Sequence, residues 1–137
     1  LSSAASDVYK RQAEDDAANR KFLTKLLAKF GDVTVVGDGF QAVKNYMQAL
    51  DDREPYQLVC LDVMMPKLDG YKALDAIRGI EGKYALIAQE KAKIIMISAL
   101  DEGGFDEEMA GNQYDCYMSK PIDILEFEMN LKRMGMI

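Results

Sequence analysis

Short apolar runs alternate along the chain with segments in which apolar residues recur at helical spacing. Four of these runs are expected to form strands, at residues 33–36, 57–61, 93–98 and 114–118, and a fifth strand is required before Ala13. Helices are predicted over residues 18–30, 43–50, 70–80 and within 101–111, with a last one that starts near Asp123, whereas residues 81–91 are polar and weakly patterned. The alternation predicts an α/β fold in which helices cover a parallel sheet.

Length and charge narrow the possible functions. The 137 residues fit one domain and leave no room for an attached catalytic or DNA-binding domain of ordinary size. Asp and Glu number 23 against 17 Lys and Arg, and this net charge of −6 argues against binding to nucleic acid. The chain contains no His, so mechanisms that need histidine ligands or a histidine base are excluded.

Neither the apolar runs nor the cysteines indicate a membrane or an oxidising compartment. No apolar run approaches the roughly 18 residues of a membrane span, and residues 1–12 lack the apolar core of a signal peptide. Cys60 and Cys116 each stand among apolar residues without a spacing pattern, as reduced core thiols do. We therefore expect a cytoplasmic domain that does not contact a membrane.

Polar side chains stand where four of the predicted strands end. Glu14 and Asp15 follow the first strand, Asp62 the third, Ser98 the fourth and Lys120 the fifth. Ligands of an open parallel sheet bind beyond the carboxyl ends of its strands, so these groups are expected to converge. Clustered carboxylates favour a divalent cation such as Mg²⁺. A metal, an ammonium and a hydroxyl together could neutralise a phosphoryl group attacked by Asp62.

These residues resemble those of response-regulator receiver domains, the phosphoacceptors of two-component signalling. Residues 62–70, DVMMPKLDG, are similar to the phosphoacceptor segment of that family. Along the chain, an acidic pair is followed by an Asp, then by Ser-Ala and last by Lys-Pro, which is the order typical of the family. The resemblance covers residues 13–137. It implies a doubly wound, five-stranded parallel sheet in the order 2-1-3-4-5, flavodoxin-like, with helices on both faces.

The resemblance also implies a role for each residue. Asp62 would take a phosphoryl group from a sensor histidine kinase or a phosphotransfer protein, and Lys120 would contact a phosphoryl oxygen. Glu14, Asp15, Asp62 and the backbone carbonyl of Met64 would hold Mg²⁺. The protein would act as a signalling receiver rather than an enzyme that turns over a separate substrate.

A switch is implied by the charge of a phosphorylated aspartate. Ser98 would move to bond the phosphoryl group, and Tyr117 would fill the space that this movement vacates. The surface read by a downstream protein target would then change. The Lys120–Pro121 peptide bond is a candidate for the cis form. Because the chain ends directly after the last helix, we expect a receiver that stands alone.

The start of the chain departs from the family pattern. The central first strand of the family is apolar, whereas Lys10, Arg11 and Gln12 would enter it here, and each unpaired buried charge costs several kcal/mol. Residues 2–12, SSAASDVYKRQ, also look like the in-frame translation of a transposon adapter from a sequencing library. Our hypothesis is that residues 1–12 are a non-native segment, followed by the receiver domain over residues 13–137.

Three other functions compete with this interpretation. Residues 37–42, GDGFQA, fit the glycine fingerprint of a dinucleotide-binding unit, with Asp62 as the acid that binds the ribose. An aspartyl phosphatase would need a second acid two residues after its nucleophile, where Met64 stands. A receiver-like adaptor that is never phosphorylated is the third alternative.

Overall fold

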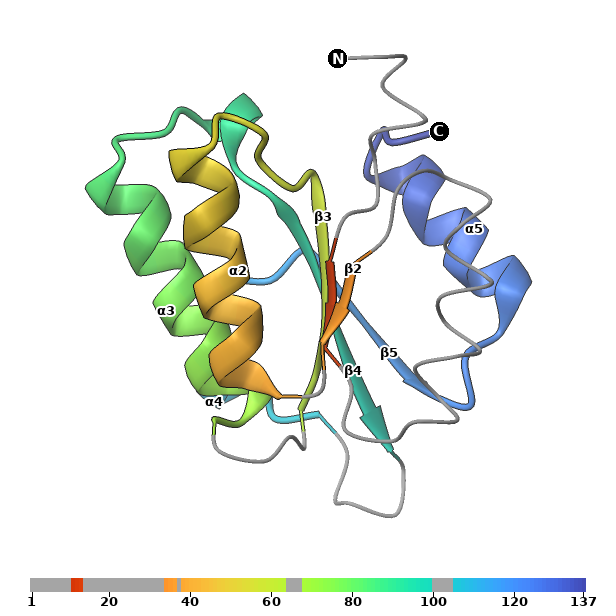
Figure 1. Cartoon of the computed structure of the whole chain (residues 1–137). Coiled ribbons are helices and arrows are strands. Elements are labelled where there is room, and N and C mark those ends of the chain that lie inside the picture. The colour runs from red at the N-terminus through yellow and green to blue at the C-terminus, as the bar shows by residue number, and fades with distance from the viewer. Residues whose placement is uncertain (1–10, 14–33, 37, 64–67, 100–104) are drawn as a thin grey trace.

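The computed structural model describes residues 11–13, 34–36, 38–63, 68–99 and 105–137 (Figure 1). Its centre is a parallel sheet of five strands in the order β2-β1-β3-β4-β5. The strands are β1 (Arg11–Ala13), β2 (Thr34–Val36), β3 (Leu58–Asp62), β4 (Lys93–Ala99) and β5 (Cys116–Lys120). This order confirms the doubly wound, flavodoxin-like sheet expected from the sequence.

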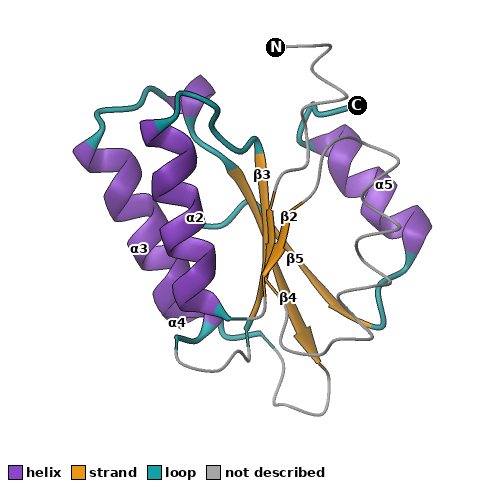
Figure 2. Cartoon of the chain, in the orientation of Figure 1, coloured by secondary structure: helices purple, strands orange, loops and turns teal. Residues whose placement is uncertain are grey.

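Helices lie on both faces of the sheet, as expected (Figure 2). One face is covered by α2 (Gly39–Asp51), α3 (Gly70–Lys83) and the short α4 (Glu107–Ala110), and the other by α5 (Ile124–Arg133) (Figure 1). A 3-10 turn, η1 (Ala88–Glu90), precedes β4 within residues 81–91, the polar and weakly patterned stretch of the sequence. The helix predicted over residues 18–30 lies outside the described residues.

Alternate side chains of the central strands enter two hydrophobic cores. Val59 and Leu61 pack into the core beneath α2 and α3, and Leu58 and Cys60 pack into the core beneath α5. All five residues of β3 are buried. A strand covered on both faces needs apolar side chains at every position, which explains why its sequence is a continuous apolar run.

An aspartate caps each of the four described α-helices and sets where it begins. Asp38 Oδ1 accepts the backbone N–H of Gln41 at 2.7 Å at the start of α2, and Asp69 caps α3 in the same way. Helix α2 therefore begins at Gly39, ahead of the predicted residues 43–50. Asp123 caps α5, which confirms the start predicted there.

The last strand begins two residues later than the predicted range 114–118. Tyr114 packs against the ring of Phe105, with 4.8 Å between the ring centres, instead of pairing with β4. The carboxylate of Asp115 accepts a backbone N–H of β4 at 2.8 Å, so the regular ladder starts only after it. Lys120 is consequently the last residue of the strand, whereas the prediction placed it after the strand.

Strand β1, which lies between β2 and β3, contains residues that were predicted to be unfavourable there. Within β1, Arg11 lies opposite Thr34 on one side and Val59 on the other, and Gln12 occupies the next position. Arg11 and Gln12 therefore lie in a strand that is paired on both sides, as predicted, whereas Lys10 lies outside the described residues. The adapter hypothesis concerns residues 1–12, of which residues 1–10 lie outside the described part of the chain, and it stays a prediction.

Both cysteines are free thiols, as predicted. Burial raises the pKa of the Cys60 thiol far above its usual value. Burial, with a smaller contribution from the negative charge of Asp115, raises the pKa of Cys116 to about 11. Across the described ranges, no helix has the length and apolar character needed to cross a membrane.

Candidate functional site

The carboxylate of Asp62 and the ammonium of Lys120 meet at the edge of the sheet where the parallel strands end. Asp62 is the last residue of β3 and is fully buried, whereas 22% of the Lys120 side chain at the end of β5 is exposed. Lys120 Nζ donates a hydrogen bond to Asp62 Oδ2, and the two form a salt bridge. The ammonium thereby offsets the lost hydration of a buried carboxylate.

Strand register brings these two residues together across β4. Asp62 lies level with Ile97, and Lys120 lies level with Ala99, further towards the carboxyl end of the same strand. The long lysine side chain spans this offset and carries its charge back to the carboxylate. The cis peptide bond predicted between Lys120 and Pro121 is present.

Ser98 lies on β4, between the strands that carry Asp62 and Lys120. It is buried, and it pairs in register with Ser119 of β5. Alternate residues of a strand share a face, so Ser98 lies on the same face as Met96, which belongs to the core beneath α2 and α3. The structure joins Asp62 to Lys120 directly and places Ser98 on the strand between them, on the face that carries Met96.

Asp62 is the predicted Mg²⁺ ligand that falls within the described residues. Glu14, Asp15 and Met64 lie outside them. In the part of the chain that the structure describes, no group of three or more His, Cys, Asp or Glu could hold a metal ion. Asp62 contributes a carboxylate, the hard oxygen ligand that Mg²⁺ takes.

Gly70 holds the start of helix α3 against the backbone of Asp62. A Cβ at Gly70 would lie 2.3 Å from the Asp62 carbonyl oxygen and 2.8 Å from Val63 Cα. The backbone N–H of Gly70 also donates to the Val63 carbonyl at 3.0 Å. Only a residue without a side chain fits this approach. Helix α3 and the end of β3 are therefore positioned as one unit.

The glycine fingerprint at residues 37–42 has a packing explanation in this fold. A Cβ at Gly39 would lie 2.1 Å from the carbonyl oxygen of Leu68, so glycine allows α2 to approach the segment that follows β3. Asp38 is the helix cap described above. Both residues thus serve the junction of α2 with its neighbours, which weakens the dinucleotide-binding alternative.

Tyr117 lies on β5, three residues before Lys120, and 45% of it is exposed. Its ring stacks on Phe105, with 4.6 Å between ring centres and 15° between the ring planes. Its neighbour Met118 belongs to the core beneath α5, so Tyr117 lies on the opposite face, together with Ser98. The residue predicted to switch is therefore held in an outward position.

A buried ionic network that the sequence analysis missed lies at the end of helix α3. The carboxylate of Glu81 is fully buried and accepts hydrogen bonds from the Tyr46 hydroxyl at 2.6 Å and the Ala92 backbone N–H at 2.8 Å. Burial and the hydrogen bond to Glu81 raise the pKa of Tyr46 far above its usual value. Glu81 lies on the same buried face of α3 as Leu74 and Ile77. This helical spacing was the signal in the sequence that Glu81 is buried.

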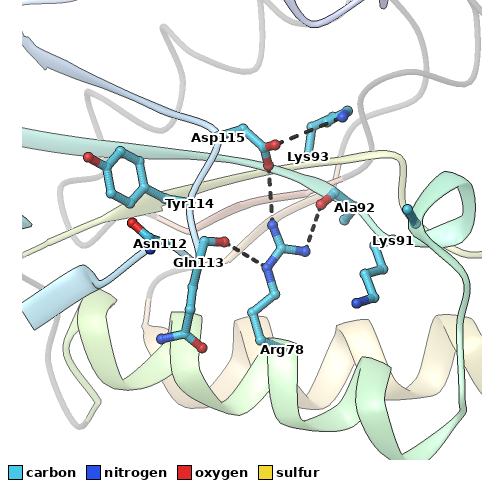
Figure 3. Close-up of a pocket in the computed structure, with 9 residues that line it drawn as sticks. Arg78, Lys91, Ala92, Lys93, Asn112, Gln113, Tyr114 and Asp115 are labelled. Carbon is cyan, nitrogen blue, oxygen red and sulfur yellow. Dashed lines mark hydrogen bonds and ion pairs between the residues drawn. The ribbon is translucent and has the colours of Figure 1, made fainter.

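Arg78 completes this network beside a pocket of about 420 Å³ (Figure 3). Its guanidinium donates to Glu81 Oε1 at 2.6 Å, to the carbonyl oxygens of Gln113 and Ala92 at 2.7 and 2.9 Å, and to Asp115 Oδ2 at 3.2 Å. Asp115 Oδ1 also forms an ion pair with Lys93 Nζ at 3.9 Å, so two carboxylates face two cations. The network ties α3 to the amino ends of β4 and β5, at the edge opposite Asp62.

Comparisons with known proteins agree on one protein family. A family model for the response regulator receiver domain matches residues 12–132. The hybrid signal transduction histidine kinase I of Dictyostelium discoideum is 34% identical over 112 residues, which is 81% of this chain. The chain spans 6% of the length of that relative.

Two solved structures are similar in both fold and sequence. The receiver domain of sensor histidine kinase PA1611 from Pseudomonas aeruginosa, with a magnesium ion in its active site cleft, is 27% identical with a TM-score of 0.71, over 93% of this chain and 98% of that one. The receiver domain of histidine kinase CKI1 from Arabidopsis thaliana, complexed with Mg²⁺, is 25% identical with a TM-score of 0.70, over 91% and 93% of the two chains.

Proposed function

Because this chain belongs to the response regulator receiver domain family, we propose that Asp62 is the residue that accepts the phosphoryl group. The observation that carries the proposal is the pairing of a buried Asp62 carboxylate with the Lys120 ammonium where β3 and β5 end. An open parallel sheet binds its ligands at this edge. A carboxylate held beside a cation at that position suits nucleophilic attack on phosphorus.

The donor would be a phosphohistidine outside these 137 residues, since they contain no His. A carboxylate oxygen of Asp62 attacks the phosphorus, a P–O bond forms and the P–N bond to the imidazole breaks. The electron pair of that bond stays on the imidazole nitrogen. A sensor histidine kinase or a phosphotransfer protein can supply such a group, and both belong to the signalling system of this family. No separate substrate is turned over in this scheme.

Lys120 and Ser98 would stabilise the transferred group. The ammonium already lies at the attacking carboxylate, so a phosphoryl group bound there places an oxygen within its reach. The Ser98 hydroxyl lies on the strand between the two partners and would donate to a second oxygen. Both groups oppose the negative charge that gathers on the phosphoryl oxygens.

Mg²⁺ fits the donor set assigned to this edge. Asp62, together with Glu14, Asp15 and the Met64 carbonyl, would supply hard oxygen ligands, and the two similar receiver structures described above contain magnesium. When bound, the ion would neutralise charge on the phosphoryl oxygens during transfer. The free thiols Cys60 and Cys116 are in keeping with a reducing, cytoplasmic setting for this reaction.

The output of the reaction would be a change in the surface around Tyr117. Phosphorylation draws Ser98 towards the new charge, and Tyr117, on the same face of the sheet, turns inward in response. A downstream protein that contacts β5 would read the difference. Neither nucleic acid nor a membrane is required as a partner.

Intact mass spectrometry tests this function directly. The protein is incubated with Mg²⁺ and acetyl phosphate, beside Asp62→Asn, and circular dichroism reports whether each chain is folded. We expect one added phosphoryl group in the unaltered chain and none in the variant. Asp123→Asn is the matched control, because asparagine caps a helix as well as aspartate does and the residue lies at α5.

Two negative results have different meanings. A folded chain that gains no phosphoryl group would favour the adaptor that works without phosphorylation. An unfolded chain would implicate residues 2–12, and the experiment would then be repeated with an apolar first strand in place of those residues. A phosphoryl group retained in Asp62→Asn would assign the acceptor to another residue.

A further inference from the structure

Phe105 stands at the centre of a cluster of aromatic rings that joins α3, α4 and β5. Its ring centre lies 5.9 Å from that of Tyr71 on α3 and 4.6 Å from that of Tyr117 on β5. The ring of Tyr114 packs on it edge-on, at 4.8 Å and 76°. Phe105 directly precedes Asp106, which caps α4. The cluster therefore connects the start of α4 to the strand that carries the candidate switch residue.

A hydrogen bond attaches this cluster to helix α3. The backbone N–H of Asp106 donates to the hydroxyl of the buried Tyr71 at 2.7 Å. Tyr71 follows Gly70, which lies against the backbone of Asp62. Tyr71 thus links the segment that starts α4 to the helix whose first residue touches the candidate acceptor. The arrangement couples two regions that are more than 30 residues apart in the sequence.

The stack on Phe105 holds Tyr117 at the surface. The nearly parallel rings stack on each other, and the residue Tyr117 remains 45% exposed. Inward rotation would carry that ring along the face of the sheet that Ser98 shares, so the stack must separate first. An aromatic pair of this kind is strong enough to shift the ratio of outward to inward positions of a side chain by about two- to tenfold.

We propose that Phe105 is a latch that holds Tyr117 outward, and that Tyr71 anchors this latch to α3 through its hydrogen bond to the backbone of Asp106. Phosphorylation of Asp62 then moves Tyr117 inward only by separating it from Phe105. The inference rests on the proposed function and deepens it, because it names the contact that opposes the switch. Phe105 and Tyr71 act through Tyr117 and are positioning residues.

The exposure of Tyr117 tests the latch, because two explanations predict opposite signs. If Phe105 merely covers Tyr117, its removal in Phe105→Ala uncovers the ring and raises its exposure. If Phe105 holds the ring outward, the same substitution lets the ring turn inward and lowers its exposure. We expect the inward population to rise about two- to tenfold without any phosphodonor.

Fluorine NMR of protein labelled with 3-fluorotyrosine measures this exposure. The chain has seven Tyr, and the resonance of Tyr117 is the one missing from Tyr117→Phe. Relaxation enhancement by a soluble paramagnetic agent reports how far the ring is exposed. Phe40→Ala is the matched control, since Phe40 is an exposed phenylalanine outside the ring cluster and its removal should leave Tyr117 unchanged.

Tyr71→Phe keeps the proposal testable if Phe105→Ala does not fold. This variant removes one hydroxyl and leaves both rings in place. We expect a smaller decrease in Tyr117 exposure in the same direction. An increase of Tyr117 exposure in Phe105→Ala overturns the latch. No change of that exposure in a folded Tyr71→Phe overturns the anchor.

Failure of the latch and failure of the proposed function can be told apart. Mass spectrometry on the same samples, with Mg²⁺ and acetyl phosphate, reports whether Asp62 is modified. A phosphorylated chain in which Tyr117 keeps its exposure overturns the latch and leaves the acceptor assignment standing. A folded chain that gains no phosphoryl group overturns the function on which the latch rests.

Discussion

A Cβ on Gly70 would lie 2.3 Å from the carbonyl oxygen of Asp62, so the start of helix α3 and the end of strand β3 share one close backbone contact. Backbone atoms cannot rotate aside as the tip of a side chain can. We therefore expect Gly70→Ala to shift α3 and to lower the free energy of unfolding by about 1–3 kcal/mol, as overpacking does. Urea denaturation measures this change, and the shift should also slow phosphorylation of Asp62.

Gly79 provides a matched control in the same helix. Apart from its chain neighbours and the backbone of its own helix, no described atom lies within 4 Å of a Cβ placed there, so Gly79→Ala removes backbone freedom without a clash. This variant should gain about 0.5–1 kcal/mol of stability. If Gly70→Ala were as stable as Gly79→Ala, the close contact with Asp62 would not constrain the site.

Lys120 should matter more for the rate of phosphorylation than for binding of the phosphodonor. Its ammonium lies at the Asp62 carboxylate, where charge would gather on the phosphoryl oxygens in the proposed transfer. We expect Lys120→Met to slow the reaction with acetyl phosphate about 100-fold or more, the usual effect of losing one such donor. The initial rate is measured by intact mass at several phosphodonor concentrations.

The control for that variant is Lys132→Met on the exposed face of α5. It removes the same charge and adds the same side chain away from the acidic edge. An equal loss of rate in both variants would mean that net charge, rather than the position of Lys120, decides the outcome.

The buried carboxylate of Glu81 should be among the most sensitive positions for stability. It accepts hydrogen bonds from Tyr46, Arg78 and a backbone N–H, all from different parts of the chain. Glu81→Gln keeps the shape but removes the charge that balances Arg78. We expect a loss of about 3 kcal/mol in the free energy of unfolding, as when one partner of a buried pair is removed.

Glu54→Gln is the corresponding control at an exposed position. It should change the free energy of unfolding by about 0.5 kcal/mol or less. Chemical denaturation of both variants in the same buffer separates the effect of burial from that of lost charge. A Glu81→Gln protein as stable as the control would contradict the role assigned to the network.

The candidate acceptor pair could be predicted because it depends on strand direction alone. Parallel strands bring their carboxyl ends to one edge, so Asp62 and Lys120 were expected to meet although 58 positions separate them. The continuous apolar run of β3 and the cap at Asp123 are also local signals, and both are present in the structure. The roles of these site residues in phosphotransfer stay predictions until the mass measurement is made.

The network at Glu81 could not be predicted in the same way. Glu81 opens a polar stretch, and a carboxylate is ordinarily placed in water. Its burial depends on Tyr46, which is 35 positions away, and on Arg78, whose other partners come from the segments just before β4 and β5. The start of β5 was misplaced for a related reason, since Tyr114 packs on Phe105 in a contact that no local pattern records.

Alkaline pH should destabilise the fold through Tyr46. Its hydroxyl donates to Glu81 Oε2 at 2.6 Å, and burial and that carboxylate raise its pKa far above the usual value of about 10. The folded chain thus keeps the proton at a pH where the unfolded chain loses it. Stability from this group is complete below pH about 10 and falls as pH rises further, by about 1.4 kcal/mol per pH unit.

Comparison with Tyr46→Phe isolates this contribution. The raised pKa values of Cys60 and Cys116 lower stability at alkaline pH in both proteins. The free energy of unfolding should therefore fall more steeply with pH in the wild type, and the difference between the two slopes is the contribution of Tyr46. Urea midpoints between pH 8 and pH 11 measure the slopes. The curves should run parallel at pH 8 to 9 and converge above pH 10, because the variant has no hydroxyl to ionise on unfolding. Parallel curves over the whole range would show that the Tyr46 proton is released as easily in the folded chain as in the unfolded one.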